Sequence, residues 1–427
     1  MPKIARVALV VALMGCYLSS AHGQSTQPAV NNTLPREWID KDTGHRVVRL
    51  SDEDGSQSLY FNENAYTPDG KKLIIQSPTG LYTIELATRK IEQIVAGPIR
   101  LIMSGFKNPT VYYRKGKFGT DENLVYAVDL NTKESRLVAT LPPGGTIYAV
   151  NADETLLGGV LTEINARSMA TTRLDPARLQ PGAPNRGLNI DERFNEHLDM
   201  DLLTVEIATG KVRTFAHSTE WLNHVQFSPS DPHFMLFCHE GPWHKVDRIW
   251  TVDVTTDEAP KLVHQRSMEM EIAGHEFFNG DGSMVWYDLQ TPRGEDFWVG
   301  GRNVKTAQRI QYHLLRDEWS VHFNVSKDGT LFAGDGGEPT AVARAENGKW
   351  IYLFRPRFLR NEGAPEIASK ELIKTGVFES ERLVNMKDHD YALEPNVTFS
   401  PDKKWIVFRS NMLGPIHVYA VEIAKAG

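Results

Sequence analysis

The chain has 427 residues, of which 41% are apolar and 24% are charged, and its formal net charge at pH 7 is −7. This apolar content is enough for a packed core and excludes a wholly disordered chain, while 33 Gly and 23 Pro exclude a collagen-like one. The acidic balance argues against a nucleic-acid partner, and two Cys can build neither a disulfide scaffold nor a structural zinc finger.

The N-terminal residues 1–23 are typical of a secretory signal peptide. Lys3 and Arg6 precede an apolar run over residues 7–13, and small residues follow as far as residue 23. The run is too short to span a membrane, and no later segment is as long as a span requires. Cys16 lies in a sequence similar to a lipoprotein cleavage box, so lipid attachment is an alternative to simple cleavage. We expect an exported, periplasmic protein in which a flexible segment, 24–36, precedes a single domain, 37–427.

A turn rich in Pro, Asp and Gly recurs along the chain, and each copy precedes a short β-rich run. The clearest copies are YTPDGKKLII at residues 66–75 and FSPDKKWIVF at residues 399–408, and others lie near residues 108, 152, 227, 279 and 326. Alternating apolar residues between such turns indicate antiparallel hairpins. A period of roughly 40 to 50 residues is typical of one four-stranded blade per repeat. The predicted fold is therefore all-β, a seven-bladed β-propeller of four-stranded antiparallel blades.

Closing the sheets into a ring leaves no long strand edge exposed. The segment RVVRL at residues 46–50 is expected to complete the last blade and so clasp the ring. Two longer intervals, 164–198 and 338–372, carry Pro and charged residues and are expected to project as loops from one face. Two stacked β-sandwich domains are the alternative, but they do not explain the regular turns.

Polar residues recur at one register of the repeat, a few residues before the turns. They are His224, His275, His322 and Glu394. Equivalent positions of a closed propeller lie on a common ring, so these side chains are expected to converge on one pocket. They serve either as hydrogen-bonded ties between blades or in catalysis or metal binding.

Three further residues, Arg248, Cys238 and Asp335, could have structural or functional roles. Arg248 forms a surface ion pair with Asp247 or another acid, or it clamps a carboxylate, because a guanidinium binds planar anions through two hydrogen bonds. Cys238 is expected to be a buried strand residue. Asp335 is expected to be a turn residue and not a ligand.

The segment FCHEGP at residues 237–242, followed by Arg248 and Trp250, resembles the oligogalacturonate lyases, which form polysaccharide lyase family 22. His275 with the Glu and Phe after it, His322 and the residues 39–50 and 399–402 extend the resemblance over nearly the whole chain. The resemblance implies a seven-bladed propeller that cleaves short α-1,4-linked galacturonate chains from pectin by β-elimination, which yields unsaturated uronides.

The resemblance also implies roles for single residues. His275 would be the base, Arg248 would bind a substrate carboxylate, and His322 would be a metal ligand. The proton that is removed lies α to a carboxylate, so a cation would stabilise the developing charge while a neutral imidazole takes the proton. Substrate binding is expected to involve His224, His239 and Tyr391.

One stretch departs from the family pattern. The family usually has His-Pro-His before its last turn, with a Gln three residues ahead, whereas this chain has Glu394, Pro395 and Asn396, with Tyr391 at the Gln position. Glu394 and Asn396 can still offer oxygen ligands to a hard cation such as Mn²⁺, Ca²⁺ or Mg²⁺. We expect a divalent cation, with Mn²⁺ favoured by the resemblance, held by His322, Glu394 and Asn396. In the alternative, the cation is absent, and Tyr391 or an Arg assumes part of its role.

Two other function classes stay open. One is a non-catalytic propeller that binds acidic oligosaccharide or scaffolds an envelope complex, since propellers often serve as platforms. The other is a hydrolase, which needs a pair of carboxylates that Glu240, Glu276 and Glu394 could supply. No feature of the sequence identifies a partner protein.

Overall fold

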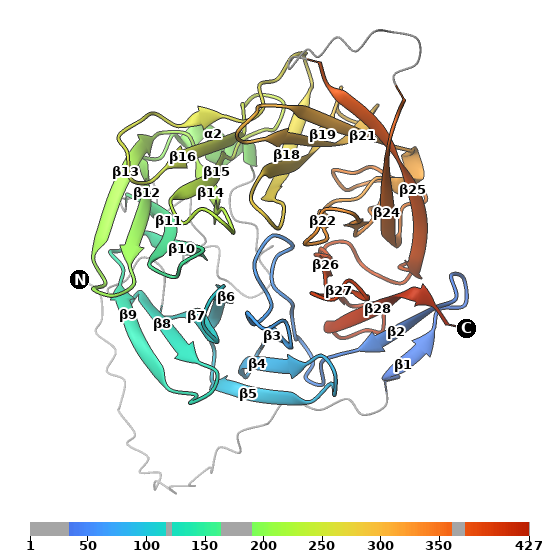
Figure 1. The fold of residues 1–427 in the computed structure, drawn as a ribbon, viewed down its shortest axis with the longest axis horizontal. Helices are drawn as coiled ribbons and strands as arrows, with labels where there is room; N and C mark the ends of the chain where they lie inside the picture. The colour runs from blue at the N-terminus through green and yellow to red at the C-terminus, as the bar shows by residue number, and fades with distance from the viewer. Residues whose placement is uncertain (1–33, 117–121, 164–189, 361–371, 427) are drawn as a thin grey trace, which may run out of the picture.

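The computed structural model describes residues 34–116, 122–163, 190–360 and 372–426. Its strands form seven radial blades around a central axis (Figure 1), as the repeat predicts. The first three blades contain, in chain order, β3 (Lys72–Ser77), β4 (Gly80–Glu85) and β5 (Ile91–Ala96); β6 (Arg100–Ser104), β7 (Thr110–Lys115), β8 (Leu124–Asp129) and β9 (Ser135–Thr140); β10 (Gly145–Val150), β11 (Leu156–Thr162), β12 (Met200–Glu206) and β13 (Val212–Ser218). The fourth contains β14 (Leu222–Phe227), β15 (Phe234–His239), β16 (Ile249–Asp253) and β17 (Lys261–Leu262).

The fifth and sixth blades are joined into one eight-stranded sheet. They contain β18 (Ile272–Phe278), β19 (Met284–Gln290), β20 (Phe297–Asn303) and β21 (Arg309–Leu314), then β22 (Phe323–Val325), β23 (Phe332–Gly334), β24 (Trp350–Phe358) and β25 (Lys374–Asn385). The outer strands β21 and β25 pair in parallel. The expectation of a loop over residues 338–372 is therefore wrong for 350–358, because β24 pairs along its whole length with the long strand β25.

The N-terminal strands close the ring. The last blade contains β26 (Thr398–Phe399), β27 (Trp405–Ser410) and β28 (His417–Lys425), to which β2 (His45–Arg49) and then β1 (Glu37–Ile39) are added. Antiparallel pairing of β2 with β28 joins the two ends of the domain, and Arg46 Nε donates to Glu422 Oε2 at 2.9 Å across this junction. The predicted clasp at residues 46–50 is confirmed.

The inner edge of the first blade is irregular. Between β2 and β3 only two isolated bridges, Gln57 with Gln76 and Tyr66 with Leu73, attach the chain to the sheet. The segment between these bridges reaches into the middle of the ring (Figure 1). Tyr60 and Phe61 belong to this segment, which takes the place that a regular inner strand occupies in the other blades.

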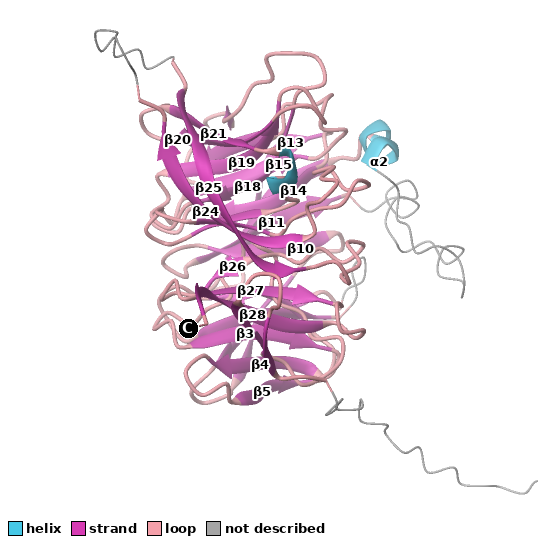
Figure 2. Cartoon of the chain, turned by 90° about the vertical axis from the view of Figure 1, so that its right-hand side faces the viewer, coloured by secondary structure: helices cyan, strands magenta, loops and turns pink. Residues whose placement is uncertain are grey.

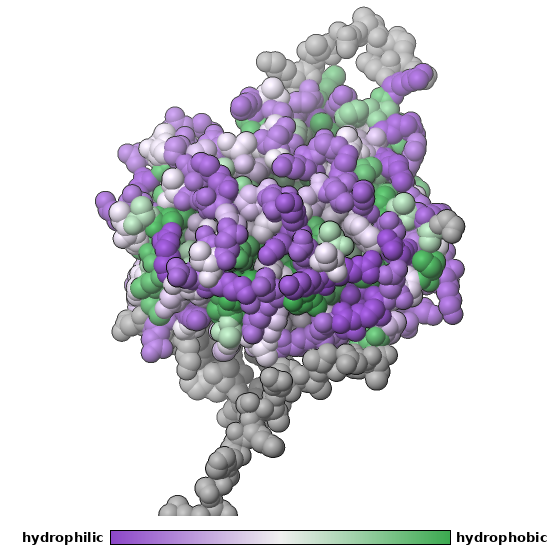
Figure 3. All heavy atoms as spheres, turned by 60° about the horizontal axis from the view of Figure 1, so that its bottom comes forward, coloured by the Kyte–Doolittle hydropathy of each residue, from purple (hydrophilic) through white to green (hydrophobic). Residues whose placement is uncertain are grey.

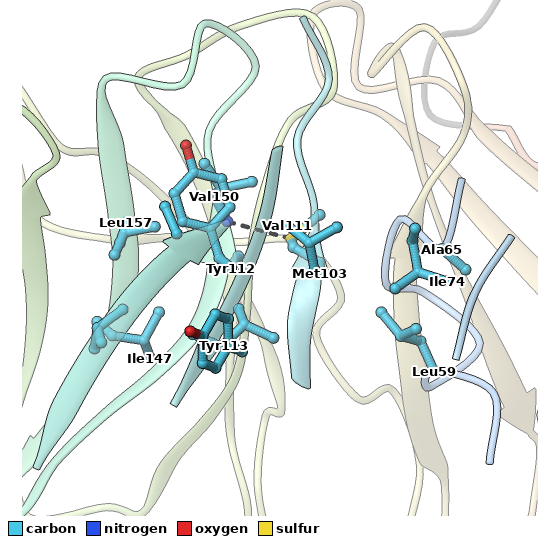
Figure 4. Packing of buried hydrophobic residues seen from close by; sticks show 14 of the residues in the cluster. Leu59, Ala65, Ile74, Met103, Val111, Tyr112, Tyr113, Ile147, Val150 and Leu157 are labelled. Atoms are coloured by element: carbon cyan, nitrogen blue, oxygen red, sulfur yellow. Dashed lines mark hydrogen bonds between the residues drawn. The ribbon is translucent and has the colours of Figure 1, made fainter. Parts of the chain in front are cut away.

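Neighbouring blades are held together by apolar side chains. Figure 4 shows this packing between the second and third blades, where Met103 and Tyr112 lie beside Val150, and all three are buried. The amide N–H of Val150 donates to the sulfur of Met103 across the same junction at 3.2 Å. Tight packing of this kind fixes the inner strands relative to one another, and with them the side chains that line the axis.

The helices lie outside the sheets. In the described ranges they are α2 (Ile190–Glu196), which Figure 2 shows apart from the strands at one face, and the 3-10 helix η2 (Arg316–Glu318). Neither is long and apolar enough to cross a membrane. Figure 3 shows a surface on which hydrophilic residues predominate and apolar ones are scattered. The predicted signal peptide 1–23, with Cys16, and most of the interval 164–198 lie outside the described residues.

Candidate active site

Two inner strands, β14 and β18, and the residues just before β26 have an unusual backbone conformation at one residue each. His224 (φ 49°), His275 (φ 45°) and Asn396 (φ 54°) have left-handed backbone conformations, which are uncommon for residues other than Gly. The pairing register shifts at this point in both β14 and β18. Strained backbone at equivalent places of several blades is a feature of functional sites, because the surrounding structure must stabilise it.

His275 and His322 are in direct contact near the axis. Their ring centroids lie 4.4 Å apart, and Phe61 packs on both, at 6.1 Å from the ring of His275 and 4.7 Å from that of His322. The hydroxyl of Tyr60 lies 3.1 Å from Nε2 of His322. The structure thus brings together two of the predicted residues, and it adds Tyr60 and Phe61, which lie in a part of the sequence that no repeat covers.

A buried carboxylate lies behind each of these two histidines. Asp288 Oδ1 is 3.4 Å from Nδ1 of His275, and Asp335 Oδ2 is 2.8 Å from Nδ1 of His322. The second oxygen of Asp335 accepts the backbone N–H of His322. Asp335 is fully buried directly after β23, so its assignment as a turn residue is wrong. Burial disfavours the charged form of His322, but Asp335 and Glu394 outweigh burial and raise its pKa.

Arg248 lies in a buried network and not on the surface. Its Nε donates to Glu276 Oε2 at 3.0 Å, and its NH1 is 3.9 Å from Glu240 Oε1. The alternative of a surface ion pair is therefore wrong. NH1 is buried and has no hydrogen-bond partner in the described residues. Trp243 packs over Arg248 at 4.9 Å and against the ring of His275 at 4.9 Å, and it separates the two.

His224 belongs to the same network. Its Nε2 is 3.8 Å from Glu240 Oε1, and Asn223 donates to the other oxygen of Glu240. Burial opposes ionisation of Glu240, yet His224, Arg248 and Asn223 lower its pKa to about 2. Arg248 likewise outweighs burial and lowers the pKa of Glu276. Glu240 and Glu276 are held as anions by these partners, an arrangement that suits positioning of Arg248 better than proton donation in a hydrolase.

The remaining predicted residues have other partners. His239 Nδ1 is 2.7 Å from Glu220 Oε2, and its ring stacks on Trp250, while burial lowers its pKa. Tyr391 is buried and donates its hydroxyl to the backbone carbonyl of Asp335 at 2.9 Å. Neither has a described contact with His275. Cys238 is buried in β15, as predicted.

The predicted metal ligands are close together, but their donor atoms face other partners. Glu394 Oε2 lies 3.8 Å from His322 Nε2, where Tyr60 also contacts the ring. The amide of Asn396 is occupied at both ends, since Oδ1 accepts from the backbone N–H of Phe61 and Nδ2 donates to the carbonyl of Glu394. Over the described ranges no three His, Cys, Asp or Glu side chains are grouped to hold a cation. The arrangement does not fit a divalent cation bound by all three predicted ligands.

A cavity of about 1320 Å³ opens beside this cluster, with Tyr60, Phe61 and His224 in its wall. Its lining includes five cationic side chains, Arg100, Arg114, Lys115, Arg193 and Lys327, and a single acidic one, Glu63. Burial raises the pKa of Glu63 to about 7, against the opposing effect of Arg100 and Arg409. A protein with net charge −7 thus has a cationic cavity at its axis. Sequence reasoning missed these arginines because nothing in a strand sequence shows which face meets the axis.

Comparison with known proteins places this geometry in a family. The family model described as oligogalacturonate lyase matches residues 33–426. The oligogalacturonide lyase of Pectobacterium atrosepticum is 26% identical over 92% of this chain and 98% of its own length, and the oligogalacturonate lyase of Dickeya dadantii is 26% identical over 90% and 95%. A solved structure, an oligogalacturonate lyase in complex with manganese, superposes with a TM-score of 0.70 at 23% identity and covers 91% of this chain and 96% of that one.

The match to the family model covers nearly the whole described propeller, and the two curated relatives align over almost their full lengths. The resemblance read from residues 237–250, His275 and His322 is thereby confirmed, and so is the expectation of a carbon–oxygen lyase. The chain belongs to the oligogalacturonate lyase family.

Proposed function

We propose that this protein cleaves short oligogalacturonides by β-elimination and releases a 4,5-unsaturated uronide. The observation that carries the proposal is a cationic cavity, inside a member of this family, whose wall includes His224 of the Arg248 network and Tyr60, which contacts His322. A polyanionic substrate needs local positive charge to enter a protein of net charge −7. The cavity lining supplies that charge.

In this proposal His275 is the base. Asp288 lies 3.4 Å from Nδ1 of His275, and in the proposal Nε2 takes the proton from the carbon α to the uronate carboxylate. A side chain that is only 9% exposed is shielded from bulk water, which strengthens its interaction with the developing charge. The electron pair of the broken C–H bond forms the new double bond, the C–O bond to the leaving sugar breaks, and the oxygen of that sugar takes a proton from water.

Arg248 neutralises the carboxylate of the reacting sugar. The pairing with Glu276 holds its guanidinium in place, and in the proposal the unpartnered NH1 donates to the substrate. Although burial works against its charge, Glu276 and Glu240 raise the pKa of Arg248, so it remains cationic. A fixed cation at the position where an enolate-like charge develops lowers the barrier without reorganisation.

The divalent cation is a separate part of the proposal. The structural relative is described in complex with manganese, and this chain has His322 with Glu394, which replaces a His of the family pattern, 3.8 Å from it. Because Asn396 and Tyr391 are committed to backbone partners, we derive no step through a metal and assign carboxylate neutralisation to Arg248.

The activity test is the appearance of unsaturated-uronide absorbance when digalacturonate is added to the purified protein. If digalacturonate, rhamnogalacturonan fragments and glucuronan fragments all give no such product, the proposal is overturned. Bound but uncleaved oligosaccharide would then indicate the non-catalytic propeller, and products without a double bond would indicate a hydrolase. Export rests on residues 1–23 alone, and recovery of the full chain in the periplasmic fraction of a bacterial host would support it.

A further inference from the structure

The second blade presents two arginines to the cavity at a distance along the ring from the histidines. Arg100 is the first residue of the inner strand β6, and it is directly opposite Arg114 of β7 in the antiparallel register. Both line the cavity. Like charges opposite each other across two strands destabilise a sheet, so this pair is unfavourable for the fold in isolation.

Neither arginine of the pair forms an ion pair with a carboxylate of the described residues. Arg36, Arg46, Arg89, Arg248 and Arg266, by contrast, each form an ion pair with an acid. Arg114 is 8% exposed and is fixed in direction, because its NH2 donates to Asn123 Oδ1 at 2.7 Å. Burial, together with the charge of Arg100, lowers the pKa of Arg114 to about 10. An anion bound between the two would relieve both effects.

Two residues connect this pair with the reacting end of the cavity. Glu63 accepts the backbone N–H of Tyr60 at 3.0 Å and lies within the electrostatic influence of Arg100. Tyr148 lines the cavity on the third blade, and Arg100, Arg114 and Glu240 all act on its hydroxyl. His224, which faces Glu240 in the network of Arg248, lines the same cavity as the arginine pair.

We propose that Arg100 and Arg114 form a second carboxylate-binding subsite, which receives a uronate unit of the substrate other than the one at His275. This inference rests on the proposed function and extends it to a substrate class: the protein favours oligouronides longer than the disaccharide. Two guanidinium groups match the planar carboxylate of a sugar acid, and Arg114 is oriented for it in advance.

The test compares di-, tri- and tetragalacturonate with the wild type and with Arg100→Gln. Arg100 is exposed and has no described side-chain partner, so its replacement leaves the fold intact. We expect KM for the longer substrates to rise about tenfold while kcat, and KM for digalacturonate, stay within twofold of wild type. Lys90→Gln, at an exposed hairpin away from the cavity, removes the same charge and is the matched control.

Calorimetric titration of the same oligouronides separates the subsite from the reaction. The subsite is supported if wild type binds trigalacturonate more tightly than digalacturonate and if this difference is lost in Arg100→Gln and weakened in Arg114→Lys. This holds even if no product forms, because the absence of product would overturn only the proposed function. Two results would overturn the subsite even if digalacturonate is turned over. In the first, wild type and Arg100→Gln bind all chain lengths with equal affinity. In the second, Arg100→Gln loses the same affinity at every chain length, and Lys90→Gln loses as much.

Discussion

The two sides of the central cavity differ in how their charged groups are satisfied. On the fourth to sixth blades several charged or imidazole side chains are paired with an oppositely charged group, such as Arg248 with Glu276 and His322 with Asp335. On the second blade Arg100 and Arg114 have no described carboxylate partner. Paired groups are held in one geometry before the substrate arrives, which suits chemistry, whereas unpaired cations gain most from an incoming anion, which suits recognition.

The largest effect is expected on the paired side, at the base. His275→Ala should lower kcat on digalacturonate by about 10²–10⁴-fold, because the positioned proton acceptor is lost. Its Tm should stay close to that of wild type, since Nδ1 of the ring has no hydrogen-bond partner in the described residues and the ring only packs on Trp243, Phe61 and His322. His313→Ala, on the outer strand β21, is the control and should keep full activity. Undiminished kcat in His275→Ala would show that the reaction, if present, uses another base.

Breaking the buried ion pair should cost mainly stability. Glu276→Gln leaves the guanidinium of Arg248 without its closest anion, and removing one partner of a buried pair costs about 3–5 kcal/mol in the free energy of unfolding. Urea denaturation measures the loss. Glu258→Gln, which breaks an exposed pair with Lys261, should give no measurable change. Equal unfolding free energies for the two variants would contradict the view that this side of the cavity is held by its pairs.

Glu63, on the border between the two sides, should make stability depend on pH. Its pKa is raised to about 7 in the folded protein, so the folded state holds its proton more tightly than the unfolded chain. The contribution of protonated Glu63 to the free energy of unfolding is fully present below pH 4.5. It is lost as the pH rises to 7, and the total loss is about 3 kcal/mol. Glu63→Gln keeps an acceptor for the N–H of Tyr60 and should remove this decline. Denaturation curves of both proteins between pH 4.5 and 8 check it, and parallel pH profiles would refute it.

The smallest effect is expected from metal removal. Because Arg248 supplies the positive charge and Asn396 is bonded to backbone groups, treatment with EDTA should leave both Tm and turnover unchanged. Elemental analysis of the dialysed protein, together with Tm, gives a readout that does not depend on activity. A stoichiometric metal, or activity lost with EDTA and restored by Mn²⁺, would instead establish the cation predicted at His322 and Glu394.

The sequence alone predicted the ring, its seven blades and the clasp at residues 46–50, because turn chemistry and strand alternation are local and repeat along the chain. It also indicated that His224, His275 and His322 share one height, since equivalent positions of a repeat become neighbours once the ring closes. The strand β24 escaped prediction because its interval shows no repeat turn, and its partner β25 lies beyond a further stretch of chain.

Only the tertiary structure decided the partners. The sequence predicts a turn residue at Asp335, but the fold buries this residue, and its carboxylate contacts Nδ1 of His322. The position of Tyr60 against His322 arises from residues 262 apart in sequence, and the opposed Arg100 and Arg114 face the cavity only because of the register of β6 and β7. A sequence repeat determines which residues lie at the same level along the axis of the ring. Long-range packing decides which charged groups meet across the ring, and so it distinguishes the paired side of the cavity from the unpaired one.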